Sequence, residues 1–191
     1  MFWNLPTLLT WARIVAIPLI VGVFYLPLPA ADVNMWASVL FVVVALTDWL
    51  DGWLARRLNQ TSSFGAFLDP VADKFLVCAS LLILLEVGRV NAMVAMVIIG
   101  REIAISALRE WMAQIGASRS VAVHMLGKLK TAAQMAAIVL LLYHGDLGFV
   151  GLPVDAQTLG TWLIYIACGL TVWSMAYYLK KSLPDIVAKA R

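Results

Sequence analysis

Long apolar segments separated by short polar links follow one another along the whole chain. A helix needs about 20 apolar residues to cross the roughly 30 Å hydrocarbon core of a bilayer. The pattern predicts six such spans, at residues 13–27, 35–56, 66–87, 90–114, 126–143 and 159–179. Residues 1–12 mix Asn, Pro and Thr with apolar side chains, which indicates a short helix lying in the membrane interface. We therefore expect an all-α integral membrane protein that forms one transmembrane domain over residues 1–191.

The composition agrees with this class. Of the 191 residues 63% are hydrophobic and only 13% are charged, whereas a soluble domain needs a more polar surface. Residues 14–30 could be mistaken for the core of a secretion signal, but the preceding stretch carries only one basic residue, Arg13, and further apolar segments follow. A retained first span is expected. Cys78 and Cys168 lie inside apolar runs and predict neither a disulfide nor thiol chemistry.

Lysine and arginine gather near the links that follow the second, fourth and sixth apolar segments. These residues are Arg56, Arg57, Arg101, Arg109, Arg119, Lys128, Lys130, Lys180, Lys181, Lys189 and Arg191. The opposite links contain Arg89 and several acidic residues. Because cytoplasmic loops of membrane proteins are rich in Lys and Arg, both termini are expected to face the cytoplasm.

Four aspartates interrupt the second and third apolar segments between residues 48 and 73. Each charge at membrane depth costs about 2.5 to 3.5 kcal/mol, so something must compensate them. Asp48 and Asp51 share one helix face, as do Asp69 and Asp73. An antiparallel hairpin would bring the four carboxylates together near the cytoplasmic surface in two layers of similar depth. One layer pairs Asp51 with Asp69, and the other pairs Asp48 with Asp73.

Several interpretations of this acidic cluster remain open. Carboxylate oxygens are the ligands that Mg²⁺ and Mn²⁺ prefer, and a pair of such ions would neutralise most of the charge and polarise a bound phosphate. Alternatively, the acids form buried ion pairs with Arg56, Arg57 and Lys74. Intramembrane carboxylates also mark ion pathways, although these acids lie on one side of the membrane only. A catalytically inactive scaffold is the fourth alternative.

Basic residues around the link from the fourth to the fifth segment face the same cytoplasmic side. They are Arg101, Arg109, Lys128 and Lys130. A phosphorylated substrate needs a cationic pocket, and arginine binds phosphate through two parallel hydrogen bonds. The alternative is that these cations contribute only to membrane orientation and to contacts with anionic lipid headgroups.

The spacing of acidic and small residues resembles a family signature. The pattern Asp48-x2-Asp51-Gly52-x2-Ala55-Arg56-x8-Gly65-x3-Asp69-x3-Asp73 is similar to that of the CDP-alcohol phosphatidyltransferases. This resemblance implies a six-helix membrane fold, commonly dimeric, that transfers a phosphatidyl group from a CDP-linked lipid to an alcohol. It also implies that the four aspartates surround two divalent ions, Mg²⁺ or Mn²⁺, and that Asp73 is the general base. The residues implied to bind CDP are Gly52, Ala55, Arg56 and Gly65.

Five further stretches resemble the bacterial members that form phosphatidylglycerophosphate. They read NLPTLLTWARIVAIP, TDWLDGWLARRLNQ, FGAFLDPVADK, REIAISALREWMAQ and VAVHMLGKLKTAAQM. The implied substrates are CDP-diacylglycerol and glycerol 3-phosphate, the implied location is the bacterial inner membrane, and the implied assembly is a homodimer among membrane lipids. The acceptor phosphate would bind near Arg101, Arg109, Lys128 and Lys130. Inositol phosphate, serine and a second phosphatidylglycerol are the nearest alternative acceptors, and no nucleic acid partner is expected.

Overall fold

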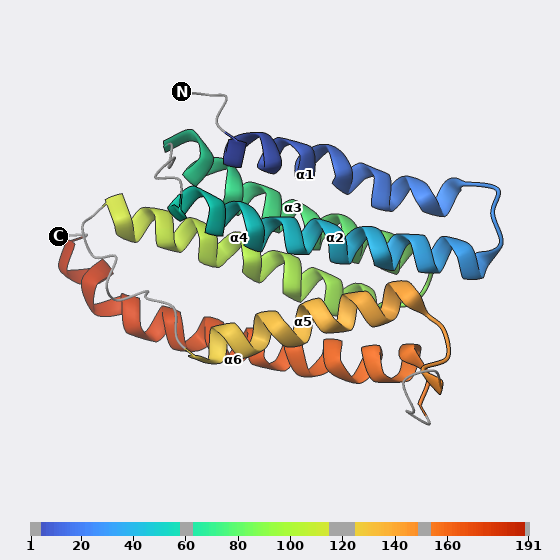
Figure 1. Ribbon diagram of the computed structural model, residues 1–191. Coiled ribbons are helices and arrows are strands. Elements are labelled where there is room, and N and C mark those ends of the chain that lie inside the picture. The colour runs from blue at the N-terminus through green and yellow to red at the C-terminus, as the bar shows by residue number, and fades with distance from the viewer. Residues whose placement is uncertain (1–4, 58–62, 115–124, 149–153, 190–191) are drawn as a thin grey trace.

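The computed structural model describes residues 5–57, 63–114, 125–148 and 154–189. Within these ranges the chain forms six α-helices and a short 3-10 helix (Figure 1). Their bounds are α1 (Leu5–Gly22), η1 (Val23–Tyr25), α2 (Ala30–Arg57), α3 (Ser63–Glu86), α4 (Ala92–Gln114), α5 (Met125–Tyr143) and α6 (Ala156–Lys189). The predicted all-α class is therefore confirmed, and each predicted span corresponds to one helix.

The helix bounds differ from the predicted spans at several ends. α1 is continuous from Leu5 to Gly22, so no break separates the expected interfacial helix from the first span at Arg13. α6 continues to Lys189, well past the predicted end at residue 179. The apolar pattern marks only the part of a helix that suits lipid, whereas the hydrogen-bonded helix can continue into polar sequence.

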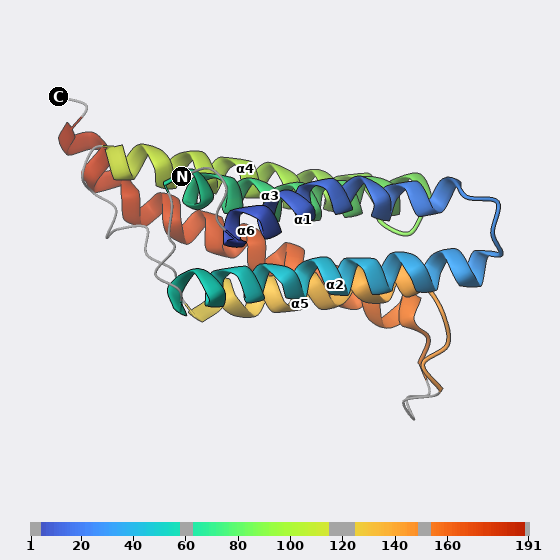
Figure 2. The same ribbon diagram turned by 45° about the horizontal axis from the view of Figure 1, so that its top comes forward.

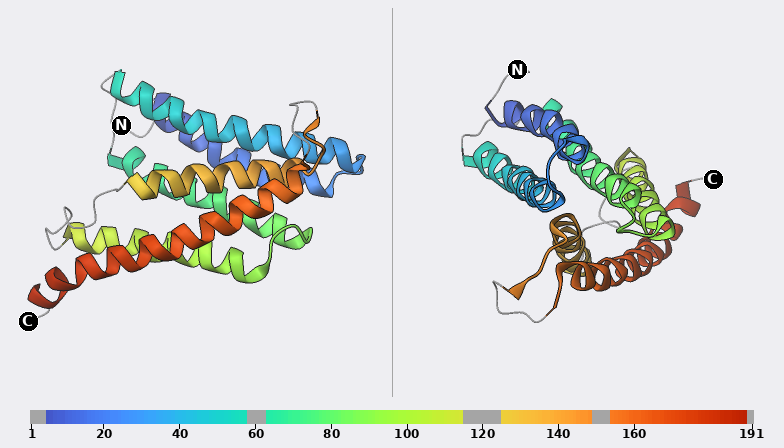
Figure 3. Two further views of the ribbon diagram at one scale, coloured as in Figure 1. Left: turned by 90° about the horizontal axis from the view of Figure 1, so that it is seen from below. Right: turned by 90° about the vertical axis from the view of Figure 1, so that its right-hand side faces the viewer.

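The helices are arranged as a closed ring. Viewed end-on, neighbouring helices follow the order α2, α1, α3, α4, α6 and α5, and α5 then packs against α2 (Figure 3). Figure 2 shows α5 running alongside α2, far from it in sequence. α1 begins and α6 ends at the same end of the bundle, where α2 also ends and α3 begins (Figure 1).

The second and third apolar segments form consecutive helices, but their main described neighbour is α1. α1 packs against both α2 and α3, whereas the described parts of α2 and α3 have few direct contacts with each other. α1 therefore lies between the two helices that carry the aspartates. Its side chains reach both of them.

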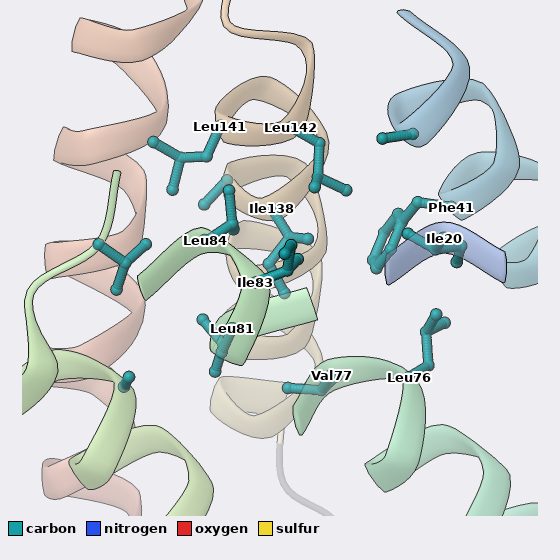
Figure 4. Close-up of a cluster of buried hydrophobic side chains, with 14 of the residues drawn as sticks. Ile20, Phe41, Leu76, Val77, Leu81, Ile83, Leu84, Ile138, Leu141 and Leu142 are labelled. Carbon is teal, nitrogen blue, oxygen red and sulfur yellow. The ribbon is translucent and has the colours of Figure 1, made fainter. Parts of the chain in front are cut away.

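Apolar side chains fill the half of the bundle that lies away from this end. Figure 4 shows Ile20, Phe41, Leu81 and Ile138 meeting from α1, α2, α3 and α5. Large apolar residues such as Trp162 remain exposed on the outside, as suits a lipid environment. The core thus holds the ring together at one end and leaves the other end free for a polar site.

Three helices contain apolar stretches long enough to cross a membrane, at Leu8–Tyr25, Ala30–Asp48 and Ala156–Lys180, among the residues that the structure describes. The apolar part of α5 is shorter, Leu129–Tyr143. α3 and α4 carry several charged residues within their length. The apolar helices support a membrane protein, and the count of six spans stays a prediction.

Candidate functional site

A cavity of about 550 Å³ lies between α2, α3, α4 and α5. Its lining comprises Ala45, Asp48, Asp69, Pro70, Asp73, Lys74, Leu76, Val77, Arg101, Glu102, Ile105, Ser106, Arg109, Thr131, Gln134 and Met135. Leu76 and Val77 also belong to the apolar core. The cavity therefore extends down to the core, with acidic residues on one wall and basic residues on another.

The acidic wall consists of Asp48 from α2 and of Asp69 and Asp73 from α3. The α3 pair lies one turn apart on one helix face, as the i, i+4 spacing predicts. The side chains of Asp48 and Asp73 are 39% and 52% exposed, so their oxygens are accessible to a ligand. The side chain of Asp51 lies outside the described residues, which leaves its predicted layer with Asp69 untested.

Two side chains from α1 bind this acidic wall. Nη1 of Arg13 donates to Oδ1 of Asp48 at 2.5 Å and lies 3.3 Å from Oδ1 of Asp73. One nitrogen therefore connects the two acids that the sequence places at matching depth. The hydroxyl of Thr10 donates to Oδ1 of Asp69 at 2.8 Å.

Arg13 and Thr10 were missed as site residues by the sequence analysis. A signal was present, because Arg13 is the only charged residue among the first 24 and lies three positions after Thr10. Two residues at that spacing share a helix face. Which neighbouring helix this face would meet could not be read from the sequence.

The described cations of the alternative ion-pair interpretation have other contacts. The guanidinium of Arg57 lies over the ring of Trp53, 5.1 Å from its centroid. Nζ of Lys74 donates to the backbone carbonyl of Pro70 at 3.0 Å. The side chain of Arg56 lies outside the described residues. The ion pairs that the structure does show on this wall are made by Arg13.

The donor chemistry of the acidic wall fits a hard divalent cation. Carboxylate oxygens from two helices line one cavity, and among the residues that the structure describes neither histidine nor cysteine lines it. As they stand, no three of the described Asp, Glu, His and Cys side chains form a group that could hold a metal ion. Arg13 already engages Oδ1 of both Asp48 and Asp73, so an ion that binds these acids would meet a positive charge beside them.

The basic wall is formed around Arg101 of α4, whose side chain is 7% exposed. Its Nη2 donates to the hydroxyl of Ser174 on α6 at 3.2 Å, and its Nη1 lies 3.3 Å from Oε1 of Glu102. Lys130 of α5 donates to the same Glu102 oxygen and is also buried. Glu102 therefore connects two of the predicted phosphate-binding cations.

An adjoining cavity, also of about 550 Å³, extends this basic wall between α4 and α5. Arg101, Arg109 and Lys130 all line it. The guanidinium of Arg109 lies over the ring of Tyr178 on α6, 5.7 Å from its centroid. Three of the four predicted acceptor-binding residues are thus brought together.

α6 contributes residues that could not be identified from the sequence, because Ser174 and Tyr178 lie in an apolar segment without a recognisable motif.

Of the other predicted residues, Gly65 is buried near the start of α3, one turn before Asp69. The side chains of Arg56 and Lys128, and the surroundings of Gly52 and Ala55, lie outside the described residues. The predicted CDP contacts therefore remain predictions.

A family model described as CDP-alcohol phosphatidyltransferase matches residues 3–173, which include all of α1 to α5 and about half of α6. The chain belongs to this family. Similar proteins from Salmonella typhimurium, Shigella flexneri and Escherichia coli are each 45% identical to it over 189 residues, which is 98% of this chain and 99% of theirs. Each is named CDP-diacylglycerol–glycerol-3-phosphate 3-phosphatidyltransferase.

Proposed function

We propose that this enzyme transfers the phosphatidyl group of CDP-diacylglycerol to glycerol 3-phosphate and releases CMP. The product would be phosphatidylglycerophosphate, a precursor of phosphatidylglycerol and cardiolipin. Relatives named for this reaction match nearly the whole chain. The observation that carries the proposal is one cavity lined by Asp48, Asp69 and Asp73 on one wall and by Arg101 and Arg109 on another.

The acidic wall suits the CDP-linked lipid. We propose that Asp48, Asp51, Asp69 and Asp73 hold two divalent cations, Mg²⁺ or Mn²⁺. When bound, such ions neutralise charge on the diphosphate and on the departing CMP. The signature assigns the CDP contacts to Gly52, Ala55, Arg56 and Gly65. The diphosphate then meets the acids while the acyl chains stay in the bilayer.

Asp73 is the proposed general base. It takes the proton from a hydroxyl of glycerol 3-phosphate as that oxygen attacks the phosphatidyl phosphorus, and the bond from this phosphorus to CMP breaks. A base must lie within hydrogen-bond reach of the proton that it takes. The position of Asp73 on the cavity wall, with a partly exposed side chain, supports this role.

The basic wall suits the phosphate of the acceptor. Nε of Arg101 is buried and has no hydrogen-bond partner among the described residues. Because an unpaired buried donor is costly, this nitrogen supports a site completed by an anionic ligand. Arg109, Lys130 and Lys128 would add charge to the same site, and the first two line the cavity next to Arg101.

We further propose six membrane spans, with both termini and the active site facing the cytoplasm of a bacterial inner membrane, and assembly as a homodimer. The start of α1 and the end of α6 lie at one end of the bundle, the end at which α2 ends and α3 begins (Figure 1). The distribution of Lys and Arg supports the cytoplasmic assignment of this end. The predicted interfacial position of the first residues remains part of this proposal.

An acceptor screen tests the reaction directly. Purified protein in mixed micelles receives CDP-diacylglycerol, Mg²⁺ or Mn²⁺, and one acceptor at a time: glycerol 3-phosphate, inositol phosphate, serine or phosphatidylglycerol. We expect CMP release and phosphatidylglycerophosphate formation with glycerol 3-phosphate, and loss of both when EDTA removes the cations. CMP release with inositol phosphate but not with glycerol 3-phosphate would overturn the acceptor assignment.

A further inference from the structure

Arg13 carries a positive charge at a buried position, where an uncompensated charge has a high free-energy cost. It is the only charged residue in α1, and its side chain is fully buried. An arginine side chain carries a positive charge in proteins. Taking such an ion out of water costs several kcal/mol unless oppositely charged partners surround it. The structure provides those partners in Asp48 and Asp73.

Two residues of α1 contact the three acids that line the cavity. Thr10 and Arg13 lie on one face of α1, and α1 lies between α2 and α3. Together they engage Oδ1 of Asp69, Oδ1 of Asp48 and Oδ1 of Asp73. Asp48, Asp69 and Asp73 all line the cavity, and in the proposed metal site they would hold a divalent cation. α1 therefore engages one carboxylate oxygen of each of these three acids, with a charged donor and a neutral one.

From this arrangement we infer that Arg13 is the internal counter-ion of the acidic wall and competes with the divalent cation for Asp48 and Asp73. The inference rests on the metal site of the proposed function. In the metal-free protein, Arg13 offsets repulsion among the carboxylates and holds α1 against α2 and α3. When a divalent cation binds, it and the guanidinium of Arg13 repel each other in a partly buried site. Arg13 must then withdraw from at least one carboxylate. Arg13 is a positioning residue, and it lowers metal affinity while it stabilises the empty site.

The test compares thermal unfolding and Mn²⁺ binding in purified full-length protein without any lipid substrate. Arg13→Gln removes the charge and keeps a polar side chain. Arg13→Lys keeps a charge that reaches fewer carboxylate oxygens at once. Lys74→Gln is the matched control, because Lys74 lines the same cavity but donates to a backbone carbonyl. Unfolding is followed in EDTA and in increasing Mn²⁺, and Mn²⁺ binding is followed by its electron spin resonance signal.

We expect Arg13→Gln to unfold at a lower temperature than the unmodified protein in EDTA and to gain more stability from Mn²⁺. Its Mn²⁺ affinity should rise by about tenfold, because a nearby like charge is removed from a partly buried site. The unfolding temperature in EDTA and the Mn²⁺ affinity of Arg13→Lys should lie between those of the unmodified protein and those of Arg13→Gln. Lys74→Gln should change Mn²⁺ affinity less than Arg13→Gln does. A merely structural arginine would not raise metal affinity on removal.

The inference is overturned if Arg13→Gln loses equal stability in EDTA and in Mn²⁺, or if it binds Mn²⁺ no more tightly than the unmodified protein. If Arg13→Gln does not fold even in Mn²⁺, the test relies on Arg13→Lys. The proposed competition is then refuted if Arg13→Lys binds Mn²⁺ no more tightly than the unmodified protein does. If the unmodified protein itself shows no Mn²⁺ response, the proposed metal site fails and the inference fails with it. A normal Mn²⁺ response that is insensitive to Arg13 refutes the inference alone.

Discussion

The acidic and basic walls of the cavity are each engaged by a side chain of opposite charge, but they obtain it differently. On the acidic wall, Arg13 comes from α1 and lies 35 and 60 positions from Asp48 and Asp73 in the chain. On the basic wall, Glu102 is the sequence neighbour of Arg101 and also binds Lys130 of α5. The acidic wall is partly compensated from a separate helix, whereas Arg101 on the basic wall is partly compensated by a residue of its own helix.

This difference indicates what each wall must do when a ligand arrives. A cation that binds the acids must compete with a guanidinium held on another helix, so binding is coupled to how α1 packs. An anion that binds Arg101 meets a site whose charge balance is set locally on α4, with Ser174 of α6 as an additional partner. Variants on the two walls should therefore affect different substrates and different measurements.

The largest effect is expected from Asp73→Asn on the acidic wall. Removing the proposed base should lower the rate of CMP release by at least about a hundredfold, the lower range for general base catalysis. Some binding of CDP-diacylglycerol should remain, because the other acids and the CDP contacts are intact. CMP release and equilibrium binding of the lipid measure the two effects. Asp32→Asn, at the opposite end of α2, is the matched control and should leave turnover near normal. Near-normal activity of Asp73→Asn would exclude Asp73 as the base.

A smaller and more selective effect is expected from Arg109→Ala on the basic wall. Loss of a charge-assisted contact of about 1.5 to 3 kcal/mol should raise the KM for glycerol 3-phosphate by roughly 10-fold to 100-fold. The KM for CDP-diacylglycerol should change less. Steady-state kinetics with each substrate varied in turn separates the two. Lys180→Ala removes an exposed positive charge from α6 and serves as the control. Equal changes in both KM values for Arg109→Ala would mean that the two walls do not bind different substrates.

The smallest effect on catalysis is expected from Arg89→Met, at the far end of the bundle. Arg89 donates to the carbonyls of Leu141 and Leu142 at 3.0 Å each and to Oδ1 of Asn34 at 2.7 Å. It thereby joins the end of α5 to α2. Losing these bonds should destabilise the fold by about 1 to 3 kcal/mol and lower the unfolding temperature.

Both KM values should stay within about twofold for Arg89→Met, because Arg89 lines neither the acidic nor the basic wall. Thermal unfolding and the same kinetic assays test this. An unchanged unfolding temperature together with a raised KM for glycerol 3-phosphate would show that remote cations also steer the acceptor. Residues that line the cavity could then no longer be distinguished in function from residues that only stabilise the fold.

Much of the site could be predicted because its information is local. The four aspartates, their spacing and the apolar residues around them lie within one stretch of sequence, and helical periodicity then places Asp69 and Asp73 on one face. The same reasoning placed Asp48 at the depth of Asp73, and Arg13 does connect the two. Arg101 and Arg109 could likewise be assigned to one helix and to the same end of the bundle.

The partners of these residues could not be predicted, because a contact between helices depends on which helix fills each place in the ring. The ion-pair alternative named Arg56, Arg57 and Lys74, which are basic residues close to the acids in sequence. The structure instead places α1 between α2 and α3. Ser174 shows the same effect, since it reaches Arg101 across 73 positions.

The sequence by itself determined the helices and the presence of a cluster of carboxylates that needs compensation, because apolar length, periodicity and charge cost are properties of single segments. It also carried the family signature. Only the tertiary structure decided that Arg13 and Thr10 meet the acids, and that Glu102 connects Arg101 to Lys130. The physical reason is that buried charges are stabilised by whatever lies within a few ångströms. The packing of six helices in a ring, rather than distance along the chain, determines those neighbours.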